Sequence, residues 1–201
     1  MADEFDEPSG KEDLPTQPVS FCPESEPEPE PEPEYCTCLD RAFVQLEVRE
    51  AVKSKRHVIT IFEEDRRRAA FFDYSAAGAK YTGSEFEFLL NIDSVTYRRD
   101  KYETDAMIAR LTDKMKQPNA AQRARVDPLN APGHWDFFLS HGQAVAGDQV
   151  ARLCLLLQEK GFTVWYDNDR LDRSTAAMVE GVQNCDNFVL FLSGDSAAGS
   201  R

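Results

Sequence analysis

The chain has 201 residues, a formal net charge of −13 and five cysteines, which fits one domain with appendages or two small domains. No run approaches the roughly 18 apolar residues of a membrane-spanning helix, and the acidic start MADEFDEPSG lacks the apolar core of a signal peptide. No second Cys or His pair at zinc spacing accompanies Cys36 and Cys38, so we expect no metal site. We also expect reduced thiols, a cytoplasmic location and no binding to membranes.

Residues 1–34 differ in composition from the rest of the chain. They hold 12 of the 36 Asp and Glu residues, a single lysine and eight of the 11 prolines. A Pro/Glu tract has almost no apolar surface to bury and repels itself, so we predict a disordered tail. From Tyr35 onward, 24 acidic and 22 basic residues nearly balance. That balance is typical of a globular domain and argues against a nucleic-acid-binding surface.

Residues 35–115 alternate between helical and strand patterns. The apolar spacing predicts a helix over residues 40–53 and a closing helix over 102–115, the latter with Ala106, Ile108, Ala109 and Leu111 toward the core. Apolar runs predict the two strands Val58–Phe62 and Phe86–Ile92. This half begins with a helix that has no strand before it. Residues 116–134 are polar and punctuated by proline, which indicates a linker.

Residues 135–201 have the complementary pattern. Asp148 is a candidate N-cap for a helix that ends at Gly161. The last strand is apolar throughout, as parallel strands buried on both faces are, and no helix follows to cover it. The predicted strands are Trp135–Leu139, Phe162–Tyr166 and Phe188–Leu192, and a second helix is predicted at Thr175–Asn184.

The two halves complete each other when residues 135–201 are placed before residues 36–115. In that order they predict a flavodoxin-like, doubly wound, parallel five-stranded sheet. The chain as written is then a circular permutant or an assembly of two partial copies. Either way, Phe188–Leu192 and Val58–Phe62 should lie side by side and parallel in one sheet.

Four segments in this cyclic order resemble the Toll/interleukin-1 receptor (TIR) domain family. The segment WDFFLSH is similar to the opening TIR strand, and GFTVWYDNDRLD is similar to the second strand and the loop that follows it. NFVLFLSGDSAAGSR resembles the third strand and the stretch before the family's Trp-Cys-x-x-Glu helix. FVQLEVREAVKSKRHVITIF resembles that helix and the fourth strand. The resemblance covers about 130 residues, divided between the two halves.

The resemblance implies one of two activities. Some TIR domains only assemble signalling complexes, whereas others cleave NAD⁺ and release nicotinamide with a glutamate of the third helix. Glu47 takes that position here, with Phe43 and Val44 where the family often has Trp and Cys. A fixed carboxylate suits this chemistry, because breaking an N-glycosidic bond builds oxocarbenium character on the ribose. Without the resemblance, a glutamate in a helix with this many charged residues would be interpreted as an ordinary solvated side chain.

Further candidate site residues follow the predicted strands. The resemblance implies NAD⁺ as a possible substrate and no resident cofactor. We expect the polar contacts to NAD⁺ to come from residues that follow the first and second strands of the permuted order. Turn and cap roles explain the same residues more simply, and exposed arginines are often unengaged. The candidate residues are Ser140, His141, Gln143, Asp167, Arg170 and Arg173.

Three functions stay open from the sequence. The first is a signalling module that associates with other TIR domains, including copies of itself. The second is an NAD⁺ glycohydrolase that uses Glu47, and the third is an inactive truncated fragment of a TIR array. In the permuted order, Arg201 would be followed by Tyr35, but no peptide connection joins them. We therefore expect both of these ends to lie beside Ser140, His141 and Asp167. Packing alone should then hold the helix of Glu47, which predicts a loosely ordered site.

Overall fold

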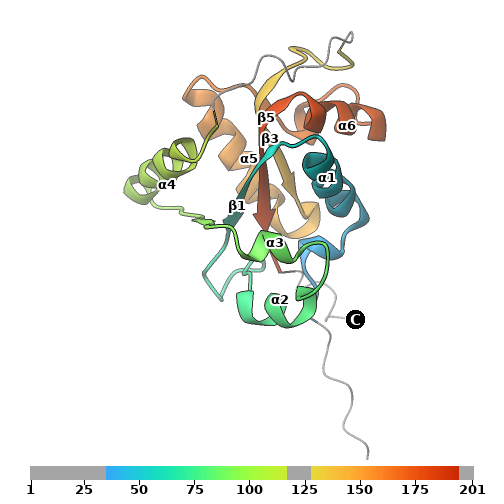
Figure 1. Cartoon of the computed structure of the whole chain (residues 1–201). Helices are drawn as coiled ribbons and strands as arrows, with labels where there is room; N and C mark the ends of the chain where they lie inside the picture. Colours follow the sequence, from blue (N-terminus) through green and yellow to red (C-terminus); the bar gives the residue numbers. More distant parts are fainter. Residues whose placement is uncertain (1–34, 117–127, 195–201) are drawn as a thin grey trace, which may run out of the picture. The chain divides into compact units, whose positions relative to one another are not determined.

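The computed structural model describes residues 35–116 and 128–194, which form a five-stranded parallel sheet between two layers of helices (Figure 1). The order of strands across the sheet is β2-β1-β5-β3-β4. Counted from β3 through β5 and then from β1, this is the flavodoxin-like order 2-1-3-4-5, so the predicted fold class is confirmed. The strands are β1 (His57–Phe62), β2 (Val95–Thr96), β3 (Trp135–His141), β4 (Val164–Trp165) and β5 (Cys185–Leu192).

The central strand β5 joins the two halves of the chain. It pairs in parallel with β1, with Val58 opposite Phe188 and Phe62 opposite Leu192, and on its other side it pairs with β3. The predicted side-by-side arrangement of these two apolar strands is therefore confirmed. Both faces of β5 are covered, which explains why its sequence does not alternate between apolar and polar residues.

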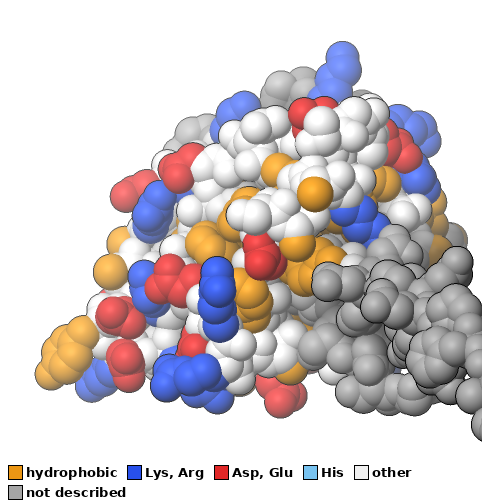
Figure 2. Space-filling model, turned by 90° about the horizontal axis from the view of Figure 1, so that it is seen from below, with side chains coloured by type: hydrophobic (Ala, Val, Ile, Leu, Met, Phe, Trp, Pro, Cys, Tyr) orange, Lys and Arg blue, Asp and Glu red, His pale blue; other side chains and the backbone are white. Residues whose placement is uncertain are grey.

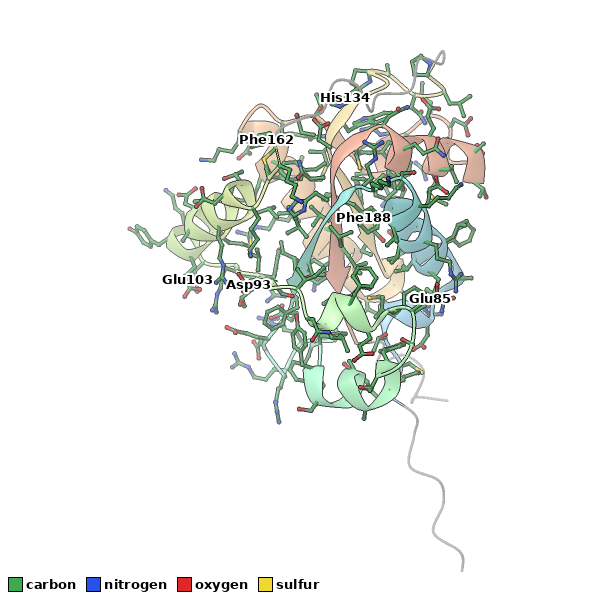
Figure 3. All side chains as sticks on the ribbon, viewed as in Figure 1. Glu85, Asp93, Glu103, His134, Phe162 and Phe188 are labelled. Carbon is green, nitrogen blue, oxygen red and sulfur yellow. The ribbon has the colours of Figure 1, made fainter. Side chains whose placement is uncertain are left out.

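Helices cover both faces of the sheet. On one face, α1 (Ala42–Lys53) and α6 (Thr175–Gln183) pack with Phe188, and α2 (Tyr74–Tyr81) belongs to the same apolar cluster. On the other face, α4 (Lys101–Asp113) and α5 (Gln143–Glu159) pack with Val189 and Phe191. Figure 3 shows Phe188 in the middle of the molecule, between these layers. No helix in residues 35–116 or 128–194 is long and apolar enough to cross a membrane.

The predicted strand Phe86–Ile92 is wrong. This segment contains the short helix α3 (Glu87–Leu90). The capping residue Phe86 and Leu89 are buried three residues apart, while Phe88 is 37% exposed. That is a helical spacing, and a short apolar run does not distinguish it from a strand. The edge strand is instead Val95–Thr96, which pairs only with Ile61 and Phe62 of β1.

Two other predicted details are wrong. Asp148 does not cap its helix, because β3 extends to His141 and α5 begins at Gln143, directly after Gly142. In α4, Ala106 and Ala109 face solvent, and the buried side chains are those of Thr104, Met107, Ile108 and Leu111. Gly161 ends the α5 segment as predicted, with a φ of 88°. The predicted tail 1–34 and most of the predicted linker, residues 117–127, lie outside the described residues.

Candidate functional site

A cavity of about 430 Å³ opens at the end of the sheet where β3 and β4 finish. In an open parallel sheet, ligands bind outside the carboxyl ends of the strands, beside the point where the strand order reverses. Figure 2 views the molecule from the side toward which β5 points, and apolar, acidic and basic side chains all lie on that face. The walls of the cavity come from both halves of the chain: from α1, the end of β3, the start of α5 and the loop between β4 and α6. They include Arg41, Phe43, Val44, Glu47, Leu139, His141, Gly142, Gln143, Ala144, Trp165, Asp167, Arg173, Ser174, Thr175 and Met178.

Glu47 links the two halves within this cavity. It lies on α1, and its carboxylate oxygen Oε2 accepts a hydrogen bond of 2.5 Å from the hydroxyl of Ser140, at the end of β3. The Ser140 side chain is 1% exposed, so its hydroxyl has a fixed direction. The predicted catalytic carboxyl therefore lies at the end of the sheet, although Ser140 stands 93 residues further along the chain.

The environment of Glu47 changes its acidity. Burial raises the pKa of its carboxyl from 4.5 to about 8, because water no longer stabilises the charged form, and the negative charge of Asp167 adds to the rise. The hydrogen bond from Ser140 opposes both effects. A carboxyl held in this range changes its charge near neutral pH, as catalytic carboxyls do.

His141 and Gln143 form one polar unit in the cavity wall. The His141 Nε2 atom lies 2.6 Å from Gln143 Oε1, and its ring is tilted against Tyr166 with 5.7 Å between centroids. Burial lowers the pKa of His141, while Asp167 and Gln143 oppose that shift. The lowered pKa favours a neutral imidazole at neutral pH.

The two predicted arginines have different places. Arg173 lines the cavity while its guanidinium donates to the carbonyl oxygens of Asn168 at 2.8 Å and Arg170 at 3.3 Å. Arg170 is not among the residues of the cavity wall. Its guanidinium donates to the carbonyls of Val164 and Ala131, along the outer edge of β4. The structure thus brings Glu47, Ser140, His141, Gln143, Asp167 and Arg173 together and leaves Arg170 outside.

Residues 137–200 match the family model described as the TIR domain. This segment belongs to the TIR domain family. The match begins within β3 and covers β4 and β5, so the half that contains Glu47 lies outside it. No curated protein and no solved structure matches the chain.

Hydrogen bonds join the described start of the chain to the end of β5. Thr37 forms an antiparallel bridge with Gly194, and the backbone N–H of Cys38 donates to the Ser193 carbonyl at 2.9 Å. The Thr37 hydroxyl lies 2.7 Å from the hydroxyl of Tyr81, which donates to Asp40. The described ends of the two halves therefore meet where β5 finishes, whereas Arg201, which the expectation named, lies outside the described residues. The expectation that packing alone holds α1 is wrong, because this network ties its preceding turn to α2 and to the end of β5.

Several cavity residues had no clear signal in the sequence. Met178 belongs to α6 and Ser174 caps that helix, and both reach the cavity only because the sheet places α6 beside α1. Arg41 precedes α1, and Phe43 lies one turn before Glu47 with 67% of its surface exposed. For Phe43 the sequence does contain signals, because the resemblance places it where the family often has Trp and the spacing of four residues from Glu47 places both on one side of a helix. In the described part of the chain, no cluster of three His, Cys, Asp or Glu residues could hold a metal ion.

Proposed function

We propose that this TIR domain cleaves the N-glycosidic bond of NAD⁺ and releases nicotinamide, with Glu47 as the catalytic carboxylate. The observation that supports this most strongly is the position of Glu47, whose carboxyl lines the cavity and is oriented by Ser140. A carboxyl so placed meets the need of the reaction for a fixed negative charge beside the ribose.

The proposed step breaks the bond between the ribose C1′ atom and the nicotinamide nitrogen. The electron pair of that bond moves to the ring nitrogen, so the cationic ring leaves as neutral nicotinamide. The positive charge that develops at C1′ is stabilised by the Glu47 carboxylate. A water molecule then adds to C1′ and loses its proton to solvent, so that the products are nicotinamide, ADP-ribose and one proton.

The raised pKa of Glu47 fits a cationic substrate. In the free protein the carboxyl is largely protonated at neutral pH, because its pKa is about 8. A positive nicotinamide ring beside the carboxyl favours the ionised form and lowers this pKa. Substrate binding would therefore generate the catalytic charge. We assign the contacts with ribose and diphosphate to His141, Gln143, Asp167 and Arg173, and the orientation of the Glu47 carboxyl to Ser140.

The TIR domain is a signalling and interaction module in general terms, and we propose that this one also associates with other TIR domains, including copies of itself. The side chain of Leu171 supports this second function. It is fully exposed on the loop between β4 and α6, and the neighbouring Arg173 lines the cavity. Phe43 adds a second apolar side chain, 67% exposed in the wall of the same cavity, and the two together suit a contact between copies that would also cover the cavity.

The test is the release of nicotinamide from NAD⁺ by the purified full chain over a range of protein concentrations. We expect turnover per molecule to rise with concentration, and Glu47→Gln and Glu47→Ala to abolish it. Glu103→Gln is the matched control, because Glu103 lies on α4, on the opposite face of the sheet from α1 (Figure 3). An inactive wild type at all concentrations, or Glu47 variants with normal turnover, would refute the proposed reaction.

A further inference from the structure

The segment Pro128–His134, which precedes β3, contains a buried polar side chain. Asn130 is 6% exposed, and its amide uses both of its hydrogen-bonding groups on one residue of the loop between β4 and α6. The Nδ2 atom donates to the Asp172 carbonyl at 2.9 Å, and Oδ1 accepts the Asp172 backbone N–H at 3.2 Å. The amide thus pairs with the backbone of Asp172 much as a neighbouring strand would.

Neighbouring residues add further attachments to the same region. The Leu129 backbone N–H donates to both carboxylate oxygens of Glu180 on α6, at 3.1 and 2.9 Å. The guanidinium of Arg170 donates to the Ala131 carbonyl and lies over the Trp135 ring at 6.0 Å from its centroid. The segment approaches from the end of the sheet where the strands begin, at which Figure 3 shows His134. Three consecutive residues therefore fasten the segment to the loop and to α6.

The inner side of the same loop is a wall of the cavity. Asp172, whose backbone Asn130 holds, accepts the Ser174 backbone N–H on its own carboxylate at 2.8 Å. The hydroxyl of Ser174 in turn accepts the N–H of Ala177 and caps α6. Arg173 and Ser174 both line the cavity. A continuous chain of hydrogen bonds thus runs from Asn130 through Asp172 to the cavity wall.

From this chain of contacts we infer that Asn130 is a positioning residue that braces the cavity wall from outside. The loop between β4 and α6 has few apolar anchors of its own, because Leu171, Arg173 and Ser174 are exposed. Its conformation therefore depends on backbone and side-chain hydrogen bonds. Removing the Asn130 amide leaves the N–H and carbonyl of Asp172 without that partner, and the loop opens more often.

The experiment is hydrogen exchange of the full chain, comparing amides of residues 170–175 with those of β5. Asn130→Ala is the test variant. Leu129→Ala is the matched control, because the Leu129 side chain is 50% exposed and its contact to Glu180 is made by the backbone. We expect Asn130→Ala to speed exchange at 170–175 on the order of tenfold, from two lost hydrogen bonds, with β5 unchanged. Equal acceleration in both regions, or none at 170–175, would overturn the inference.

A second readout rests on the proposed NAD⁺ cleavage. If the brace positions the wall that contacts substrate, Asn130→Ala should raise KM for NAD⁺ several-fold and leave kcat within about twofold. A fall in kcat at constant KM would contradict the brace as a determinant of substrate binding. If the wild type releases no nicotinamide, the proposed reaction fails, and the hydrogen-exchange result still decides the brace.

Discussion

Replacing Glu47 by glutamine should make the protein more stable, and increasingly so as the pH rises. The pKa of this carboxyl is 4.5 ordinarily and about 8 in the folded protein, mainly because of burial. Below about pH 4.5 the group is protonated in both the folded and the unfolded state. Between that pH and 8 the unfolded chain loses the proton while the folded chain keeps it, so the folded state loses stability as the pH rises. Glutamine does not titrate, and its amide oxygen can still accept the Ser140 hydrogen bond.

The expected size follows from the shift of the pKa. One pH unit between the two pKa values is worth about 1.4 kcal/mol, so the full interval corresponds to at most about 5 kcal/mol. Glu47 lines an open cavity and keeps some contact with solvent, so we expect about 2–3 kcal/mol by pH 8. Urea unfolding of both proteins at pH 5, 6, 7 and 8 measures the difference, in which other titrating groups cancel. A difference that stays flat or falls with pH would refute this explanation of the pKa.

Three further predictions concern the site and the core. The kcat/KM for NAD⁺ should rise about tenfold between pH 7 and 9, because the ionised fraction of free Glu47 rises through a pKa of about 8; a flat profile would argue against Glu47 as the titrating group. Ser140→Ala should move that profile to higher pH and Asp167→Asn to lower pH, since the serine lowers and the aspartate raises the Glu47 pKa; shifts in the opposite directions would contradict the assignment. Phe188→Ala should cost about 3–5 kcal/mol in chemical unfolding, because the ring is fully buried; a loss under 1 kcal/mol would show that β5 is not central.

The sheet was predictable where burial on both faces leaves a continuous apolar run. Phe188–Leu192 and Val58–Phe62 have such runs, and their pairing follows from the order that completes the fold. The edge strand Val95–Thr96 was not predictable. It has two residues and pairs with a strand on one side only, which is too short to show an alternating or continuous apolar pattern. The nearby run from Phe86 to Ile92 is apolar for another reason, since Phe86 and Leu89 pack on the core from a single helical turn.

The site was predictable as far as residues follow strand ends. His141 and Asp167 are found by that rule, and Glu47 by its resemblance to the TIR glutamate. We expected Arg170 to contact NAD⁺, but its guanidinium binds backbone carbonyls instead. The sequence of a loop gives no sign of such contacts. The role of Asn130 had no signal either, since it lies in a polar stretch typical of a linker. Contacts between distant segments decide both cases.

We interpret the order of the two halves as a circular permutation of the TIR fold. The topology supports this, because β5 lies between β1 of the first half and β3 of the second. The bridge between Thr37 and Gly194 stands where an unbroken chain would continue from the third strand toward the helix of Glu47. Hydrogen bonds would then replace the missing covalent connection.

The central claim is that a carboxyl from one half and a hydroxyl from the other form a single site. The most direct measurement is an NMR titration of the Glu47 side-chain carboxyl carbon in the full-length protein, with its signal identified by its absence in Glu47→Gln. We predict a midpoint near pH 8. The midpoint should move upward in Ser140→Ala, because the hydrogen bond from Ser140 stabilises the ionised carboxylate and this variant removes it. A midpoint near 4.5 that is the same in both proteins would contradict the account.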